Sequence, residues 1–170
     1  MSILCDIIFT IRMVEFSLEL ATAVAFEAHE GQVDKAGVDY INHPMGVMEL
    51  VEGHDAKLLA IIHDVVEDSP ITFEELLDMG CPPHVIDALR LVTHDPDFDG
   101  THEAYFKKIH KIADSGNQLA IDMKFADLTH NTDRRRINGE PTERDVVRWG
   151  KYEKSKAILR PLVSGYLLAI

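Results

Sequence analysis

Apolar residues recur at intervals of three and four along most of the chain, which is the spacing of one face of an α-helix. No run alternates between apolar and polar residues as a half-buried strand would, and no internal repeat or linker interrupts the pattern. The predicted helices cover residues 13–29, 44–52, 55–67, 73–79, 82–92, 101–115, 118–131 and a long last helix from 142 into the apolar stretch 159–170. The sequence therefore predicts an all-α fold, a single-domain helical bundle.

The third of these helices is the most informative, because eight of the eleven residues from 56 to 66 are apolar and surround its axis. A helix that is apolar on all sides is expected at the centre of a fold. Four polar residues, three or four positions apart and so on one helix face, stand near its end: His63, Asp64, Glu67 and Asp68. Charged groups are rarely buried unless they are paired or bind a metal ion. The stripe is a candidate metal site or, alternatively, a buried hydrogen-bond network around one histidine.

Two residues elsewhere could complete a metal site. His43 stands directly before Pro44 at a predicted helix start, where its side chain can point inward or cap the helix. Asp127 lies in an apolar helix, where a lone carboxylate is costly without a cation unless it bonds a neighbouring helix. Two imidazoles and two carboxylates suit a divalent ion of the manganese, iron or zinc type. Five other histidines lie in polar contexts and are expected to be ordinary surface or capping residues: His54, His84, His94, His102 and His110.

The charge of the chain narrows the choice of partners. Its 170 residues include 17 basic and 29 acidic side chains, for a formal net charge of −12. Such a balance argues against a nucleic acid polymer or an anionic membrane as partner. A small phosphorylated substrate remains compatible, provided that the site supplies local positive charge.

The two cysteines and the N-terminal residues bear on location. Cys5 and Cys81 cannot form a disulfide framework and indicate a reducing compartment. The apolar start lacks the basic region and cleavage site of a signal peptide. We therefore expect a cytoplasmic protein with one domain over residues 13–170. Residues 1–12 are an N-terminal extension or the first helical turns, or else no part of the native protein.

The order His43, then His63-Asp64, then Asp127 resembles the signature of the HD metal-dependent phosphohydrolases. The phrase from His63 to Asp68, His-Asp-Val-Val-Glu-Asp, is more specific. With the segments 28–32, 40–44, 72–77 and 126–131, it resembles the (p)ppGpp hydrolase domain of RelA/SpoT enzymes and small stand-alone alarmone hydrolases, over about residues 20–135. The resemblance implies an HD-type helical bundle around one Mn²⁺ ion. It also implies that the 3′-diphosphate of (p)ppGpp is removed to give GDP or GTP and pyrophosphate.

The resemblance also assigns roles residue by residue. The metal ligands would be His43, His63, Asp64 and Asp127, the acidic pair handling water and its proton would be Glu67 and Asp68, and the substrate contacts would be Lys35 and Asn131. His29 and His130 would support the site without binding the metal. This division agrees with metal-ion chemistry, in which a carboxylate one helical turn from the ligands can take a proton from water.

One departure affects the substrate. Members of that family commonly carry an arginine where this chain has Asp34, beside Lys35. The three arginines at 134–136 either replace the missing positive charge or form a solvated helix end. Two other hypotheses therefore remain: an HD phosphohydrolase acting on another nucleotide or phosphorylated metabolite, and a non-catalytic nucleotide-binding module. The protein can be monomeric or oligomeric in either case.

Overall fold

The computed structural model describes residues 15–95, 97–137 and 139–169, and in these ranges regular secondary structure is helical, apart from one isolated bridge between Val33 and Asp39. The predicted all-α fold is confirmed; the predicted extension 1–12 falls outside these ranges. The helices are α2 (Leu18–Ala28), α3 (Asn42–Leu50), α4 (His54–Ile62), α5 (Val65–Asp68), α6 (Phe73–Asp78), α7 (Pro83–Val92), α8 (His102–Asp114), α9 (Gln118–Thr132) and α10 (Glu143–Leu159), with 3₁₀ turns η1 (Arg134–Arg136) and η2 (Gly165–Ala169). Across the described ranges, no helix has the length and apolar character needed to cross a membrane.

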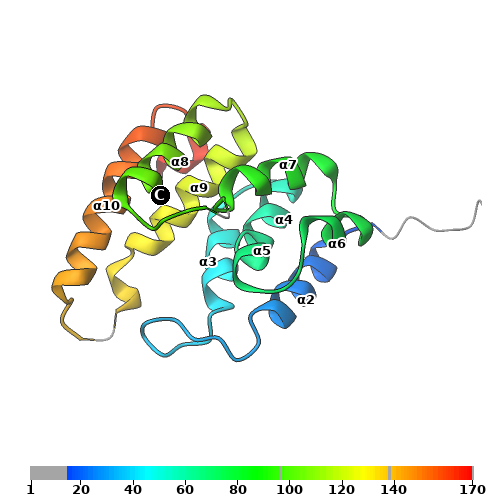
Figure 1. Cartoon of the computed structure of the whole chain (residues 1–170), viewed down its shortest axis with the longest axis horizontal. Helices are drawn as coiled ribbons and strands as arrows, with labels where there is room; N and C mark the ends of the chain where they lie inside the picture. Colours follow the sequence, from blue (N-terminus) through cyan, green and yellow to red (C-terminus); the bar gives the residue numbers. More distant parts are fainter. Residues whose placement is uncertain (1–14, 96, 138, 170) are drawn as a thin grey trace, which may run out of the picture.

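Helix α9 is the centre of the molecule, with α10 and α8 on one side and α3, α4 and α7 on the other (Figure 1). Its side chains from 120 to 128 are buried, apart from that of Lys124. Helix α4 is equally enclosed, because residues 58–62 have no exposed surface. Since α3, α4 and α9 contact one another, residues far apart in the sequence meet where these three helices pack.

The helix predicted over residues 55–67 is interrupted, which the apolar pattern does not show. Helix α4 ends at Ile62, and α5 begins at Val65 after a turn at His63 and Asp64. The physical reason is local: Nδ1 of His63 lies 2.8 Å from the carbonyl oxygen of Ala60, which in a continuous helix would accept from the amide of Asp64. The four polar residues therefore do not lie on one unbroken helix face.

Helix boundaries elsewhere follow the capping signals in the sequence. Thr72 and Glu75 form a capping box at the start of α6, and Thr142 caps the start of α10. The prediction of one helix from Thr142 through 159–170 is wrong at its end, because α10 stops at Leu159. Arg160 still has helical backbone angles, but Pro161 has no backbone N–H to donate to the preceding turn, and the chain continues through a turn into η2.

Candidate metal centre

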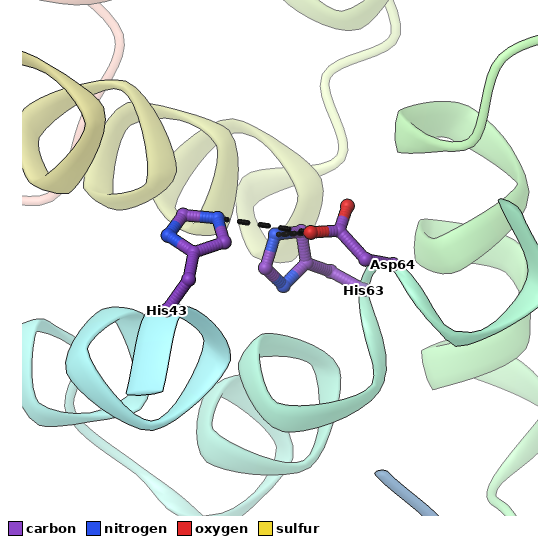
Figure 2. Close-up of side chains that lie close together, drawn as sticks. All are labelled: His43, His63 and Asp64. Atoms are coloured by element: carbon purple, nitrogen blue, oxygen red, sulfur yellow. Dashed lines mark ion pairs between the residues drawn. The ribbon is translucent and has the colours of Figure 1, made fainter. Parts of the chain in front are cut away.

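Two imidazoles and a carboxylate converge where α3 meets the turn after α4 (Figure 2). His43 projects from the first turn of α3, whereas His63 and Asp64 occupy the turn itself. The Oδ2 atom of Asp64 lies 3.1 Å from Nε2 of His63 and 3.7 Å from Nε2 of His43. One ligand atom from each of the three residues lies within 4.8 Å of the others, which is close enough to hold one ion.

Asp127 of α9 brings a second carboxylate to this cluster. Its Oδ1 atom lies 3.2 Å from Nε2 of His43 and 3.9 Å from Nε2 of His63. Both histidines and Asp127 are buried, with side-chain exposures of 3–6%. The structure thus brings together all four residues that the sequence proposes as metal ligands, from three helical segments.

The donor set fits a divalent cation. The Nε2 atom of His63 is buried and makes no hydrogen bond among the described residues, although oxygen atoms lie close to it. Burial alone would lower the pKa of His63, but the carboxylates of Asp64 and Asp127 outweigh burial and raise the pKa to about 9. A positive charge is therefore favoured at this position, and a cation bound to Nε2 would replace the proton.

Each imidazole is oriented by a second contact. Nδ1 of His43 lies 2.8 Å from Nδ1 of His130, and Nδ1 of His63 bonds to the Ala60 carbonyl. These contacts leave Nε2 of both His43 and His63 facing the carboxylates. Burial, together with the neighbouring Arg136 and His43, lowers the pKa of His130 to about 4, so His130 is neutral and can accept the proton on Nδ1 of His43.

The two carboxylates are held just as firmly. The hydroxyl group of Tyr40 donates to Oδ2 of Asp64 at 2.6 Å. Lys124 donates to Oδ2 of Asp127 at 2.8 Å, and the side-chain amide of Asn131 donates to Oδ1 at 2.5 Å. Burial disfavours the positive charge of Lys124, but the neighbouring Asp127 carboxylate outweighs burial, raises the pKa of Lys124 and keeps its amine protonated. Asp127 is thus an ionised carboxylate with a built-in counter-charge.

Glu67 and Asp68 lie beside the cluster, but they face different spaces. Glu67 lines the cavity next to the cluster and accepts a hydrogen bond from the backbone amide of His94, whereas Asp68 lines an adjoining cavity that Glu67 and His94 also border. Protein atoms partly desolvate the Glu67 carboxyl group and raise its pKa, although it remains open to solvent in the cavity. Burial and the charge of Asp64 raise the pKa of Asp68.

A cavity of about 620 Å³ opens next to the cluster. Both residues proposed as substrate contacts, Lys35 and Asn131, line it. Its cationic side chains are Lys35, Lys124, Arg136 and Arg148. Seven acidic side chains line it as well, among them Asp34, Glu67 and Asp145, so the cavity presents both charges. The four cationic side chains are the groups on its wall that could contact an anionic substrate.

Several residues of the site are not found by reasoning from the sequence. His94 was expected at the surface, but it lines both cavities, stacks on Phe98 at 3.8 Å between ring centroids, and burial lowers its pKa to about 4. Tyr40 belongs to the segment 40–44 that carries the family resemblance, but nothing in the sequence indicates its hydrogen bond to Asp64. Lys124 does carry a signal: a lysine three residues before Asp127 in an apolar helix has the spacing of an ion pair.

The described residues thus form a helical bundle that encloses a histidine–aspartate cluster beside a cavity with both cationic and acidic walls. A solved structure described as a metazoan ortholog of SpoT that hydrolyzes ppGpp matches with a TM-score of 0.75 over 89% of both chains. The two sequences are 24% identical, so this likeness establishes the fold. No protein-family model matches the chain.

Particular relatives are identified by sequence. The chain is 31% identical over 116 residues to a guanosine-3′,5′-bis(diphosphate) 3′-pyrophosphohydrolase of Haemophilus influenzae, which covers 64% of this chain and 17% of that protein. It is 38% identical over 63 residues to the bifunctional (p)ppGpp synthase/hydrolase SpoT of Escherichia coli, and the aligned region covers 35% of this chain and 9% of SpoT. It is 45% identical over 60 residues to the guanosine-3′,5′-bis(diphosphate) 3′-pyrophosphohydrolase MESH1 of Danio rerio, and the aligned region covers 31% of this chain and 33% of MESH1. The chain therefore resembles the (p)ppGpp hydrolases and spans at most a third of the length of these three relatives.

Proposed function

We propose that the chain is a metal-dependent phosphohydrolase that removes the 3′-diphosphate of a (p)ppGpp-type nucleotide, releasing GDP or GTP and pyrophosphate. The observation that carries the proposal is the convergence of His43, His63, Asp64 and Asp127 beside a cavity whose wall includes four cationic side chains. The similarity to proteins named (p)ppGpp hydrolases supports the choice of substrate. His43, His63, Asp64 and Asp127 would hold one divalent ion. The mixed nitrogen and oxygen set suits Mn²⁺, iron or zinc, and the resemblance to the alarmone hydrolases selects Mn²⁺ among them.

A bound divalent ion supplies two effects: it lowers the pKa of a water molecule and polarises a phosphoryl oxygen. The chain provides the rest. Glu67 borders the cavity with a raised pKa, which suits a carboxylate that accepts a proton from the attacking water. Asp68, with its own raised pKa on the adjoining cavity, would pass that proton on. The water oxygen bonds to phosphorus, the bond to the ribose 3′-oxygen breaks, and the proton ends on that oxygen.

Lys35 and Asn131 would bind the nucleotide beside the reacting phosphate. Lys35 is exposed on the cavity wall, and burial together with the charge of nearby Arg148 lowers its pKa. Like charges held close together are stabilised when an anion binds between them. The amide of Asn131 bonds to Asp127, so a contact to substrate there would be coupled to the metal cluster.

A second function deserves a test because of Asp34. An HD-type hydrolase acting on another nucleotide or phosphorylated metabolite would use the same cluster, and Asp34 stands on the cavity wall where the resembling alarmone hydrolases commonly carry an arginine. Incubation of Mn²⁺-loaded protein with ppGpp, GTP and other phosphorylated nucleotides, followed by chromatography of the products, decides between the two. Release of GDP and pyrophosphate from ppGpp supports the proposal. Turnover of another compound alone favours the second function, and no turnover with retained binding indicates a non-catalytic module.

A further inference from the structure

Arg136 is a cationic side chain of the cavity that the proposed mechanism does not use. It lies in η1, directly after α9, and its side chain is 26% exposed. Its two neighbours behave differently: Arg135 is 90% exposed and pairs with Asp133, and Arg134 lies over the ring of Trp149. Of the three consecutive arginines, only Arg136 lines the cavity.

The guanidinium of Arg136 is held loosely. Its Nη1 atom donates to the carbonyl oxygen of His130 and to Oδ1 of Asn131, and Nη2 donates to Oδ2 of Asp34, all at 3.4 Å. These contacts occupy three of the five N–H donors of an arginine. The remaining two, including Nε–H, have no acceptor within the described ranges. As far as the described residues go, two donors are therefore available for a ligand in the cavity.

Asp34 is anchored independently of Arg136. Its Oδ1 atom accepts hydrogen bonds from the backbone amides of Ala36 at 2.8 Å and Val38 at 3.1 Å, which fixes the loop. The other oxygen faces Arg136. Because the carboxylate is tied to the loop and the pair is long, Asp34 acts as a counter-charge that an anion can replace.

Asn131 connects Arg136 with the metal cluster. It accepts from Arg136 through Oδ1 and donates to Asp127 through Nδ2. The guanidinium is thus two hydrogen bonds away from a proposed metal ligand, on the wall of the same cavity. A substrate whose reacting phosphate lies at the cluster would bring its other phosphate oxygens within reach of Arg136.

We infer that Arg136 binds a phosphate group of the substrate through its two available N–H donors, displacing the counter-charge of Asp34. The inference rests on the proposed function for the identity of the nucleotide, but not for the chemistry of the contact. A planar guanidinium suits phosphate because it can donate two parallel hydrogen bonds, which a lysine cannot do. The contact lies away from the reacting phosphorus, so it strengthens binding in the ground state and the transition state alike.

The test compares Arg136→Gln with Arg135→Gln, a matched control one residue away and outside the cavity. With ppGpp as substrate, Arg136→Gln should raise KM by about 10- to 100-fold, the effect of losing a charged hydrogen bond, while kcat stays within about threefold. Arg135→Gln should leave both constants unchanged. Arg136→Lys, which keeps the charge but loses the paired donors, should raise KM by about three- to tenfold, and this variant decides the matter if the glutamine variant does not fold.

Calorimetric binding of ppGpp, GTP and inorganic pyrophosphate separates this inference from the proposed function. If the wild-type protein does not hydrolyse ppGpp, yet Arg136→Gln weakens binding of any of these anions and Arg135→Gln does not, the proposed function fails and the inference stands. If ppGpp is hydrolysed but Arg136→Gln behaves like Arg135→Gln, the inference is overturned. The inference is also overturned if the wild-type protein binds none of the three anions.

Discussion

Gly46 provides a sharp test of how the metal cluster is supported. It lies in α3, three residues after His43, and a Cβ atom added there would stand 2.2 Å from Nε2 of His130 and 2.8 Å from its Cδ2 atom. Such distances are far below van der Waals contact, so the imidazole of His130 has to move. Movement would break the 2.8 Å contact between His130 and His43 that orients the proposed metal ligand.

Two opposing effects set the size of the change in Gly46→Ala. In an open helix position, alanine is favoured over glycine by about 1 kcal/mol. Overpacking in a well-packed region costs about 1–3 kcal/mol, so we expect net destabilisation of roughly 0–2 kcal/mol. Loss of a group that orients a metal-bound histidine weakens metal affinity by about 10- to 100-fold. The metal affinity should therefore change more clearly than the stability.

Calorimetric titration with Mn²⁺ and thermal unfolding measure the two effects. Gly150→Ala in α10 is the matched control, because no heavy atom lies within 4 Å of its added Cβ. That control should raise stability by about 0.4–1 kcal/mol and leave metal affinity unchanged. Adding His130→Ala to Gly46→Ala should cause no further loss beyond that of His130→Ala alone. Wild-type Mn²⁺ affinity in Gly46→Ala would refute the proposed support of His43 by His130.

Three further predictions concern the metal, the proton acceptor and the acid on the cavity wall. A chelator should abolish hydrolysis and lower the melting temperature, because an ion held by the four proposed ligands would tie three segments together, and Mn²⁺ should restore both. Full activity in metal-stripped protein would contradict the proposed role of the cluster. Glu67→Gln should lower kcat by about 10²–10⁴-fold while Mn²⁺ stays bound, whereas Asp64→Ala should lose the ion. Because the pKa of Glu67 is raised and the proposed role requires its ionised form, the rate of the wild-type protein should fall as the pH drops, beginning above the usual titration range of a glutamate. The pH–rate profile of Glu67→Gln should lack this acidic limb. Equal loss of metal in Glu67→Gln and Asp64→Ala would show that the two roles are wrongly divided. Asp34→Asn keeps the oxygen that accepts from the loop amides but removes the negative charge that competes with the substrate phosphates for Arg136. KM for ppGpp should therefore fall by up to about fivefold. A raised KM would mean that Asp34 positions Arg136 instead.

Local patterns predict the helices well, because helix periodicity and capping depend on neighbouring residues. The capping box of Thr72 and Glu75 appears as expected. The break between α4 and α5 does not, because it arises from one side chain, His63, bonding to a carbonyl oxygen. An apolar pattern records which residues are buried, and it does not record competition for backbone acceptors.

The candidate cluster is visible in the sequence through residue type, spacing and resemblance, but its supporting contacts are not. His130 lies 87 residues from His43, and Arg136 lies 102 residues from Asp34. Such pairs depend on how helices pack, which no local spacing encodes. The charge of the cavity could therefore not be judged from Asp34 alone.

The break at His63 has a consequence for how the site can be altered. Adjacent residues on a regular helix point about 100° apart, so two neighbours cannot readily serve the same ion. By taking the carbonyl of Ala60, the ring of His63 ends α4 and turns Asp64 toward the same point. His63 is therefore both a candidate ligand and the residue that shapes the backbone for its neighbour. A transplant of this dyad into another helical protein would have to carry the turn with it, because the two side chains alone do not specify their directions.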